Sequence, residues 1–529
     1  MRTISKFIIA IVLTIAPVTT PSLVGRAGGE NLFAQSINYL TDLQRAIALT
    51  DVTMQKSFTG SSLRMYDTYD IANRKGSGTA DVWPYTAALE AHCSVLEALK
   101  LLKEAAPDLY ADTHDRFVKR LRQLYDNLAY YAGSYALSSY AQRRYWTIYG
   151  VHRSNTKGTA TVTGIENVYD DQMWLCRELV RAYRLTGDKD YLSEATMLAD
   201  YCVDGWDCCL DANGNEYGGI SWGPGYNSKH SCSNGPIIQP LVWLADIYRT
   251  DDEAEDLRYN YILPDGTRTH SMRRHSDVYL EMAQKVYAWQ KENLLNRSTG
   301  VYWDMLGAPG EIKYVTIGRD TYRDHVDTGR PSGTAYTYNT GTMLAGATEL
   351  YRVTNDNAYL QDVNDLCRNS LNQFSKGRRY DGITFREWPT DEVATSGFNT
   401  WFDDVLMRAF VDASVHDISQ ATTSLKSFRQ NLDYAWEHHL TEGFLPIHLI
   451  DGWEGTTVTK GFHQMAFASE LAMLAVWQFR QEQLVGITNP QPSALNSIPS
   501  ILYDLSGIPS QPPLHRGLYV MNGRKIVIK

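Results

Sequence analysis

The chain contains a weak internal repeat in which a helix, a short polar turn and a second helix follow one another. Residues 181–201, RAYRLTGDKDYLSEATMLADY, resemble residues 349–369, ELYRVTNDNAYLQDVNDLCRN, and ADIYRT at 245–250 begins a third copy. In the third copy an insertion at about 251–275 delays the second helix to Ser276. Apolar residues recur every three or four positions, which is typical of helices with one buried face. The repeating unit is therefore predicted to be a helical hairpin.

The same periodicity extends from about residue 36 to residue 482, and few stretches alternate in the way that a sheet requires. Loops rich in glycine and aromatic residues, such as NGNEYGGISWGPGYN, STGVYWDML and YDGITFREW, separate the hairpins. Hairpins joined by long loops predict an all-α fold of toroidal form, whose loops gather at one end and form a cleft. A linear solenoid is the alternative, but the degenerate copies and the long loops favour the toroid.

The N-terminal residues 1–26 have the pattern of a secretory signal peptide. Arg2 and Lys6 precede an apolar run at 7–16, and small residues and prolines follow it. This run is too short for a comfortable membrane span. We therefore expect an exported protein with no membrane span, located in the periplasm, at the cell surface or outside the cell.

Two further segments follow the helical region, which is predicted to cover residues 36–484. Residues 485–500 are rich in Pro, Ser and Asn, which is typical of a linker. In residues 501–529 two short β runs flank Asn522 and Gly523, a pair favoured in two-residue hairpin turns. We expect a small C-terminal tail of β type. It resembles the extensions that some extracellular Gram-negative proteins use for export or surface attachment.

The composition argues against several classes of partner. A formal net charge of −10 opposes binding to nucleic acid, which needs clustered Lys and Arg. The 34 Tyr and 13 Trp fit either stacking surfaces for sugar rings or a tyrosine-rich core. Seven cysteines without a repeated CxxC spacing argue against a metal site, although a disulfide among Cys202, Cys208, Cys209 and Cys232 stays open. We expect a monomer.

Two adjacent aspartates, Asp170 and Asp171, stand at the start of a predicted amphipathic helix. On a helical wheel Cys176 and Val180 lie on the apolar face, whereas both aspartates and Trp174 lie opposite. On a surface helix that opposite face would be wet, and the acids would simply complement the helix dipole. The aromatic residues beside the acids favour a pocket floor instead.

The spacing of this pair also suits catalysis. Consecutive residues at a helix start can place two carboxyl groups about 5 Å apart, the separation used by retaining glycosidases. Two carboxylates so close disfavour double ionisation, so one pKa should rise while the helix N-terminus holds the other group ionised. Asp170 and Asp171 are therefore the candidate catalytic residues, and the spacing alone leaves open which one takes which role.

A second pair, Asp403 and Asp404, occurs in FNTWFDDVLMRAFVDA, also before an amphipathic run. An N-cap without a catalytic part is the favoured interpretation. The alternative is a carboxylate that shares a cleft with the first pair, and a separation of about 6.5–9.5 Å would then indicate inversion.

Four segments resemble glycoside hydrolase family 76, the bacterial α-1,6-mannanases and their fungal relatives, and they occur in the family's order. They are YDDQMWLCRELVRAYRLTGDKDYL at 169–192, GGISW at 218–222, SNGPIIQPLVWLADIYRT at 233–250 and YTYNTGTMLAGATELYRVTNDNAYL at 336–360. The resemblance covers most of residues 80–480. It implies an (α/α)6 barrel that acts on α-1,6-linked mannan with retention of configuration and without a metal or other cofactor.

By motif position the resemblance implies that Asp170 is the nucleophile and Asp171 the acid/base. It further implies a cleft lined by Trp222, Asn234, Tyr338 and Asn339. Aromatic core packing and loop capping are the alternatives for these four. The full candidate substrate-binding set also contains Tyr169, Trp174, Asp403 and Asp404.

Two features depart from the family pattern. The family usually has a Lys-Gly pair near the position of Asp403, where this chain has FNTWFDD, and the insertion at 251–275 is long and charged. Both bear on the substrate subsites more than on the reaction. The resulting hypothesis is an exported, endo-acting α-1,6-mannanase. A transglycosylase, a hydrolase of another α-linked glycan and a non-catalytic surface glycan-binding protein are the alternatives.

Overall fold

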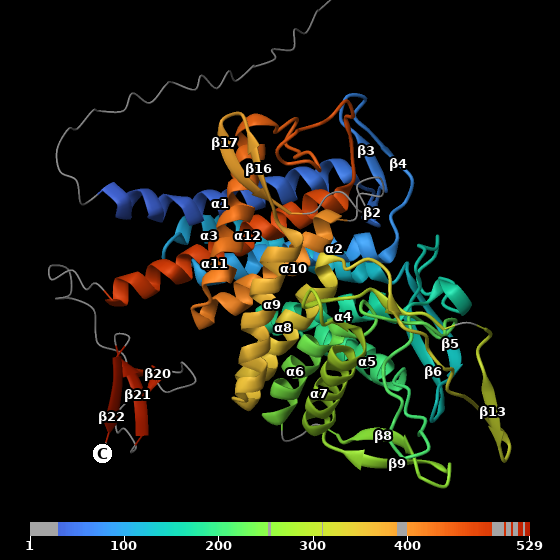
Figure 1. Cartoon of the computed structure of the whole chain (residues 1–529). Helices are drawn as coiled ribbons and strands as arrows, with labels where there is room; N and C mark the ends of the chain where they lie inside the picture. Colours follow the sequence, from blue (N-terminus) through green and yellow to red (C-terminus); the bar gives the residue numbers. More distant parts are fainter. Residues whose placement is uncertain are drawn as a thin grey trace, which may run out of the picture.

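A computed structural model describes residues 30–251, 255–308, 310–388 and 399–488 together with the strands of the tail, and these residues form twelve α-helices (Figure 1). Six helices form an inner ring: α2 (Val82–Leu101), α4 (Tyr169–Thr186), α6 (Gly235–Arg249), α8 (Thr337–Thr354), α10 (Asn399–Ala413) and α12 (Gly461–Thr488). Six helices cover it from outside: α1 (Glu30–Ser57), α3 (Pro107–Leu128), α5 (Lys189–Asp204), α7 (His275–Leu294), α9 (Asn357–Phe374) and α11 (Ser419–His438).

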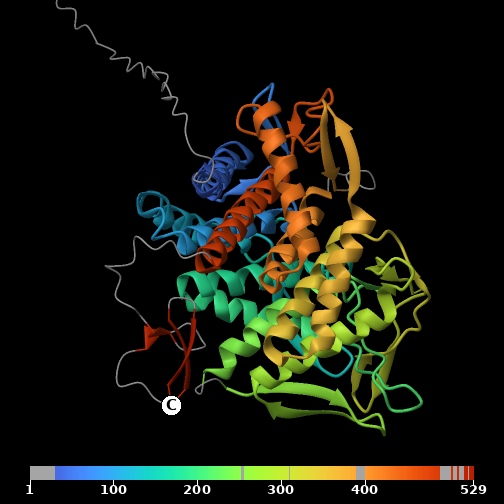
Figure 2. The ribbon, with the colours of Figure 1, turned by 60° about the vertical axis from the view of Figure 1, so that its left-hand side comes forward.

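The inner ring is closed. Each inner helix packs against the next one along the chain, and α12 packs against α2. The outer helices α3, α5, α7, α9 and α11 each pack on the inner helix that precedes them. The first helix, α1, packs on α12, so the two ends of the helical region lie side by side (Figures 1 and 2). The predicted (α/α)6 barrel is thus confirmed, and the solenoid alternative is wrong.

Burial follows this two-layer arrangement. The outer helix α9 buries one stripe, at Val363, Leu366, Cys367, Ser370 and Phe374, with steps of one, three and four residues. The inner helix α4 is buried on both faces, because one side contacts α5 and the other faces the barrel interior. The side of α4 that the helical wheel placed opposite the apolar face is therefore the interior wall of the barrel and not a wet surface.

The repeated turn in the sequence has a physical explanation. Gly187 after α4 and Asn355 after α8 adopt the left-handed conformation, with φ of 76° and 55°, and end their helices. The next residue caps the following helix: Asp188 accepts a hydrogen bond from the Asp190 backbone N–H, and Asp356 does the same at the start of α9. The motifs TGD and TND are therefore compact reversals between an inner and an outer helix.

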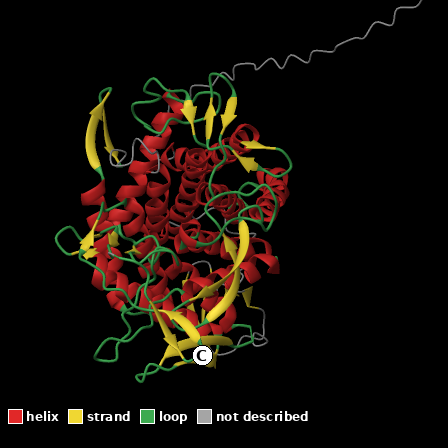
Figure 3. Cartoon of the chain, turned by 90° about the vertical axis from the view of Figure 1, so that its right-hand side faces the viewer, coloured by secondary structure: helices red, strands yellow, loops and turns green. Residues whose placement is uncertain are grey.

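Because each outer helix reverses the chain, all six inner helices run in the same direction. Their N-terminal ends lie at one end of the barrel, where the longer connections also lie. These connections carry short antiparallel pairs, which lie around the helices (Figure 3): β5 (Ala132–Ser138) with β6 (Arg143–Tyr149), β13 (Tyr314–Ile317) with β14 (Asp320–Arg323), and β16 (Lys376–Tyr380) with β17 (Ile383–Glu387).

The insertion at 251–275 also contains a hairpin, β8 (Leu257–Ile262) with β9 (Arg268–Arg273), and α7 follows it at His275. The described residues form nine small sheets in all. The sequence predicted few strands, and it missed these hairpins because strands of two to seven residues are too short for a periodic signal.

The tail forms the expected hairpin, β21 (Gly517–Met521) with β22 (Arg524–Ile528). Two further strands, β19 (Leu502–Tyr503) and β20 (Pro509–Ser510), extend it to a four-stranded sheet. The predicted signal peptide lies outside the described residues, as does most of the predicted linker, since α12 continues to Thr488.

All seven cysteines are buried and unpaired, so the disulfide considered for the cysteines between 202 and 232 is absent. Among the described residues no helix is long and apolar enough to cross a membrane. The same part of the chain contains no group of three or more His, Cys, Asp or Glu side chains suited to hold a metal ion.

A close contact between α8 and α10 at Gly341 generates a stability prediction. A Cβ atom at Gly341 would lie 2.8 Å from Leu406 Cα and 2.9 Å from Val405 O, which are backbone atoms. Gly341→Ala should therefore lower the free energy of unfolding by about 1–3 kcal/mol, although alanine usually favours a helix. Denaturant unfolding followed by circular dichroism measures this change.

Gly346→Ala, in the same helix, is the matched control. Its Cβ would meet a side-chain atom of Ile238 at 2.9 Å, and a side chain can move where a backbone cannot. The loss should be smaller than at Gly341. A neutral or stabilising Gly341→Ala would contradict the described contact between α8 and α10.

Candidate active site

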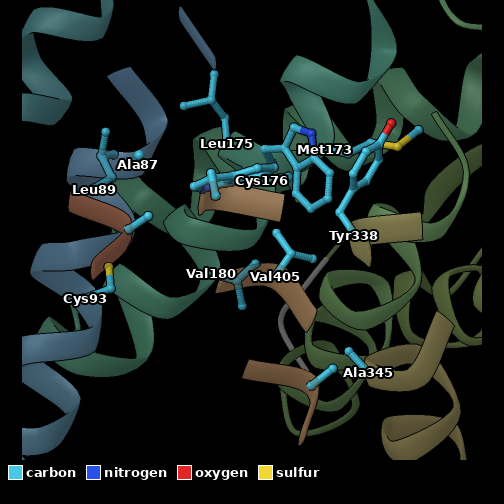
Figure 4. Packing of buried hydrophobic residues seen from close by; sticks show 14 of the residues in the cluster. Ala87, Leu89, Cys93, Met173, Leu175, Cys176, Val180, Tyr338, Ala345 and Val405 are labelled. Atoms are coloured by element: carbon cyan, nitrogen blue, oxygen red, sulfur yellow. The ribbon is translucent and has the colours of Figure 1, made fainter. Parts of the chain in front are cut away.

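The structure brings most of the predicted site residues to one end of the barrel. Asp170 and Asp171 lie in the first turn of α4, and Tyr338 and Asn339 in the first turn of α8. Asn234 precedes the first residue of α6. Figure 4 shows the interior just behind this end, where Tyr338 of α8 and Met173 of α4 point into the same space.

Hydrogen bonds to β6, to α5 and to the loop before α6 fix the start of α4. The Tyr169 backbone N–H donates to the Trp222 carbonyl at 2.8 Å. The Gln172 amide donates to the Tyr149 carbonyl at 2.7 Å and accepts from the Tyr149 backbone N–H at 3.0 Å. Asn167 donates to the Tyr201 hydroxyl at 2.6 Å. The two carboxyl groups are consequently carried on a rigid helix start.

A buried ion pair joins the neighbouring loops. Lys229 donates to Asp207 at 2.8 Å, and the His325 ring lies 2.7 Å from the same carboxylate oxygen. Next to it, β7 (Lys229–His230) pairs with β12 (Met305–Leu306), which also pairs with β15 (Pro331–Ser332). The loop before α6 and the loop before α8 are therefore joined by an ion pair, a histidine contact and a small sheet.

The Asp170 carboxyl is half-buried, and its Oδ1 atom is buried without a hydrogen bond to any described residue. Burial raises the pKa of Asp170 to about 6, while the nearby thiol of Cys232 and indole of Trp222 limit the increase. Trp222 Nε1 likewise has no hydrogen bond of normal geometry, although the indole lies close enough to Asp170 to lower the pKa of its carboxyl.

The pKa of Asp171 is raised more strongly than that of Asp170. Its side chain is only 5% exposed. Burial raises the pKa of Asp171 well above its usual range, and the charges of Asp170 and Asp81 raise it further. As the pH rises, Asp170 therefore ionises before Asp171, and there is a range in which one carboxylate and one carboxylic acid stand side by side.

Partly exposed aromatic rings flank the pair on two sides. On one side the Trp222 ring packs between Tyr226 and His230, with centroids 4.6 and 4.9 Å away. On the other side Phe402 packs against Tyr338 at 4.3 Å and Tyr336 at 5.3 Å. Such faces can stack on sugar rings.

Three of the predicted substrate-binding residues are buried and contact other parts of the protein. Tyr169 is 2% exposed and its ring packs on Tyr201 at 4.9 Å. Trp174 is 3% exposed and lies edge-on to Trp401 at 4.7 Å. Asn234 is fully buried, with its amide bonded to backbone groups of the surrounding loops, as in the loop-capping alternative.

Asp403 and Asp404 are the fifth and sixth residues of α10, so they do not cap that helix. Both are buried, and burial raises the pKa of each carboxyl well above its usual range. The charges that act most strongly on Asp404 are those of Glu90 and Arg408, so this aspartate belongs to the interior of the barrel. The N-cap interpretation is therefore wrong.

Sequence reasoning missed Asp304, which lies in the aromatic loop STGVYWDML. Burial raises the pKa of Asp304 to about 6, while Asn339 and Tyr338 nearby lower it. His230 Nδ1 lies 3.9 Å from an Asp304 oxygen. The available signal was an acid directly after a large aromatic residue, since Asp304 follows Trp303 as Asp170 follows Tyr169.

Comparisons with known proteins agree with this architecture. The sequence matches the model of Glycosyl hydrolase family 76 over residues 128–256 and 271–478, with a gap where the β8–β9 hairpin lies. A search of curated proteins finds no match in sequence.

Solved structures share the fold at low sequence identity. A family 76 mannosidase from Bacteroides thetaiotaomicron VPI-5482 is 19% identical, covers 83% of this chain and 100% of its own, and superposes with a TM-score of 0.60. A family 76 glycoside hydrolase from a bovine Bacteroides thetaiotaomicron strain is 18% identical over 83% of this chain and 79% of its own, with a TM-score of 0.61. The α-1,6-mannanase of Salegentibacter sp. HEL1_6 is 18% identical over 82% and 99%, with a TM-score of 0.54.

The closed double ring of helices and the match over most of that ring lead to one assignment. The chain belongs to glycosyl hydrolase family 76 and is a glycoside hydrolase.

Proposed function

We propose that the protein is an endo-acting α-1,6-mannanase that hydrolyses its substrate with retention of configuration. The observation that carries this proposal is the pair of adjacent carboxyl groups at the start of α4, whose pKa values are raised to different extents. A retaining glycosidase needs one ionised nucleophile and one protonated acid beside the scissile bond. Asp170, with the lower pKa of the two, is the proposed nucleophile, and Asp171, with the higher pKa, is the proposed acid.

The structures of relatives support the substrate class. Inactive variants of the Salegentibacter mannanase, in which two consecutive aspartates are replaced, were solved in complex with α-1,6-mannotriose and with α-1,6-mannotetrose. In this chain the adjacent aspartates occupy the first turn of an inner helix. We assign them the same importance for turnover.

The proposed reaction has two steps. An Asp170 oxygen attacks the anomeric carbon, the glycosidic C–O bond breaks, and Asp171 gives its proton to the leaving oxygen. In the second step Asp171, now a carboxylate, takes a proton from water, and that water displaces Asp170 from the anomeric carbon. Asp171 ends protonated and Asp170 ionised, so the pair returns to its starting state.

The walls of the site suit a neutral sugar polymer. Trp222 and Tyr226 on one side and Tyr336 and Phe402 on the other offer partly exposed rings for stacking. Asp304 adds a carboxyl group that can accept hydrogen bonds from sugar hydroxyls. These five side chains are the proposed substrate contacts.

We also propose that the protein is exported, because Arg2 and Lys6 precede a short apolar run at its N-terminus. N-terminal sequencing of protein recovered from the cell exterior or the periplasm tests this. Cleavage near residue 26 is the expected result, and an intact N-terminus in the cytoplasm is the opposing one.

Replacement of either catalytic aspartate should abolish most turnover. Asp171→Asn should lower the turnover of α-1,6-mannan by about 10²–10⁴-fold, the usual contribution of acid–base catalysis, and Asp170→Asn by at least as much. Both substitutions preserve shape and remove a buried acid, so thermal unfolding should be nearly unchanged. Asp211→Asn, at a partly exposed position in the loop before α6, is the control and should keep full activity.

Azide rescue separates the two roles. With an activated α-mannoside, Asp171→Ala plus azide should yield the α-mannosyl azide, because the glycosyl-enzyme still forms. Asp170→Gly plus azide should yield the β-mannosyl azide, because azide attacks in a single displacement. Exchanged stereochemistry would mean exchanged roles, and near-normal activity of either variant would refute the assignment.

The pH profile should reflect the raised pKa of the nucleophile. Asp170 must be ionised to attack, so kcat/KM should fall as the pH drops through about 6, and not through the ordinary aspartate value near 4. Trp222→Phe removes a group that stabilises ionised Asp170, so it should move this acid limb to higher pH. A limb near pH 4, or one that Trp222→Phe leaves in place, would contradict the described environment.

Product sizes distinguish modes of action. A digest of debranched, linear α-1,6-mannan should give a mixture of oligosaccharides from its earliest stage, as expected for internal cleavage. A single small product from the start would instead indicate exo action, and products longer than the starting oligosaccharide would indicate a transglycosylase. Chromatography of timed samples makes this comparison.

A further inference from the structure

A cavity lies in the barrel, away from the two aspartates. It has a volume of about 270 Å³ and is formed by the C-terminal halves of α2, α4, α10 and α12 with one residue of α6. Arginines dominate its wall: Arg177, Arg181, Arg184, Arg408 and Arg480. Along α4 the rise from Asp170 to Arg184 is about 20 Å, so the mouth of this cavity is remote from the catalytic end.

The carboxylates around this cavity do not balance its arginines. Glu90 accepts from Arg177 and Arg408. Glu178 is shared by Arg177 and Arg181.

At the mouth, Glu97 accepts from Arg181 at 3.0 Å and lies 3.9 Å from Arg480. Three carboxylates therefore pair with four of the five guanidinium groups, whereas Glu349 and Asp246 act on Arg184 without forming an ion pair with it. Asp412 also lines the cavity, but burial raises the pKa of its carboxyl, and Gln239 donates to it at 2.9 Å. The five arginines of the cavity wall outnumber its two carboxyl groups, those of Glu97 and Asp412.

Several of these guanidinium groups have N–H donors that make no hydrogen bond within the described residues. Within the described part of the chain, Arg177 Nη2 and Arg408 Nη2 make no hydrogen bond, and Arg184 has no carboxylate partner. Arg184 and Arg177 instead lie over the Trp243 ring, 5.0 and 5.5 Å from its centroid. Stacking holds a guanidinium plane in place and leaves its edge donors available.

The neighbouring carboxylates do not fully compensate for the free-energy cost of burying Arg177 and Arg184. Burial lowers the pKa of Arg177, and the positive charge of Arg408 lowers it further. Burial likewise lowers the pKa of Arg184. An anion between these groups would relieve both effects, since it supplies hydrogen-bond acceptors and opposite charge together.

We propose that this arginine cavity binds a small oxyanion, inorganic phosphate or sulfate or the phosphate group of a phosphorylated sugar. Guanidinium groups match the geometry of phosphate oxygens through paired N–H donors. A cavity of about 270 Å³ leaves room for a tetrahedral anion. Because α4 and α10 are opposite members of the inner ring, a bound anion bridges the barrel between Arg177 and Arg408.

The first test is the thermal unfolding of the full-length protein in phosphate, sulfate and chloride at equal ionic strength. Phosphate should raise the melting temperature along a saturable curve, and chloride should not. Mannose 6-phosphate, with mannose as its control, tests whether a sugar-borne phosphate binds better than the free ion. Isothermal titration calorimetry with phosphate should give one site.

Variants at the mouth separate this site from a general salt effect. Arg184→Met and Arg480→Met remove cations without leaving Glu90 or Glu178 unpaired, and each should weaken phosphate binding about tenfold or more. Arg249→Met, an exposed position at the same end, removes the same charge and should have no effect. All three should hydrolyse mannan normally, because none is near Asp170.

Two results would overturn the proposal. One is a melting temperature that does not respond to phosphate or sulfate in a saturable way. The other is an equal response in wild type, Arg184→Met and Arg480→Met, which would show only the general effect of excluded salts on folded proteins. Either result would show that the arginines form only an internal ion network and do not bind an anion.

Discussion

The arrangement of the barrel depends on one buried carboxylate, that of Glu90 in α2. It accepts hydrogen bonds from Arg177 of α4 and from Arg408 and Trp401 of α10, the last at 3.0 Å. Burial alone would raise the pKa of Glu90, but the charges of these arginines lower it below its usual range. Three inner helices thus share one ion cluster, and loss of the carboxylate would leave two buried cations with fewer partners.

This cluster also supports the catalytic end. The Trp401 indole that donates to Glu90 packs edge-on against Trp174, which lies one turn after Asp170 in α4. The sequence predicted Tyr169 and Trp174 as sugar contacts. In the structure both are buried and pack against other aromatic residues beside the acid pair. These packed aromatic side chains limit the reorganisation of water around the two carboxyl groups. The same burial raises the pKa values of Asp170 and Asp171.

Sequence reasoning located the features with a local signal. The turns TGD and TND predicted helical reversals because a left-handed residue followed by a capping aspartate is a local device. The adjacent Asp170 and Asp171 stood out because acids rarely neighbour large aromatic residues at a helix start. The family resemblance added the closed ring, which periodicity alone left in competition with a solenoid.

Features that depend on distant partners gave no such signal. Glu90 in AALEAHCSVLEAL reads as an ordinary polar position of an amphipathic helix, because its partners lie 87 and 318 residues away. The wheel for α4 separated two faces correctly but could not show that both are buried, since a helix between two layers has no wet side. Asp304 was overlooked because its loop carries no periodicity.

The parallel direction of the inner helices gives the two ends of the barrel opposite electrostatic character. Six N-termini meet at the catalytic end, where aligned peptide dipoles favour negative charge, and the ionisable acids Asp170, Asp171 and Asp304 are found there. The C-terminal turns favour positive charge, and Arg184 of the arginine cavity lies in the last turn of α4. Burial opposes the dipoles at the first end strongly enough to raise the pKa of Asp170 and of Asp171, so desolvation outweighs the helix dipole at the site where the proposed chemistry needs a proton.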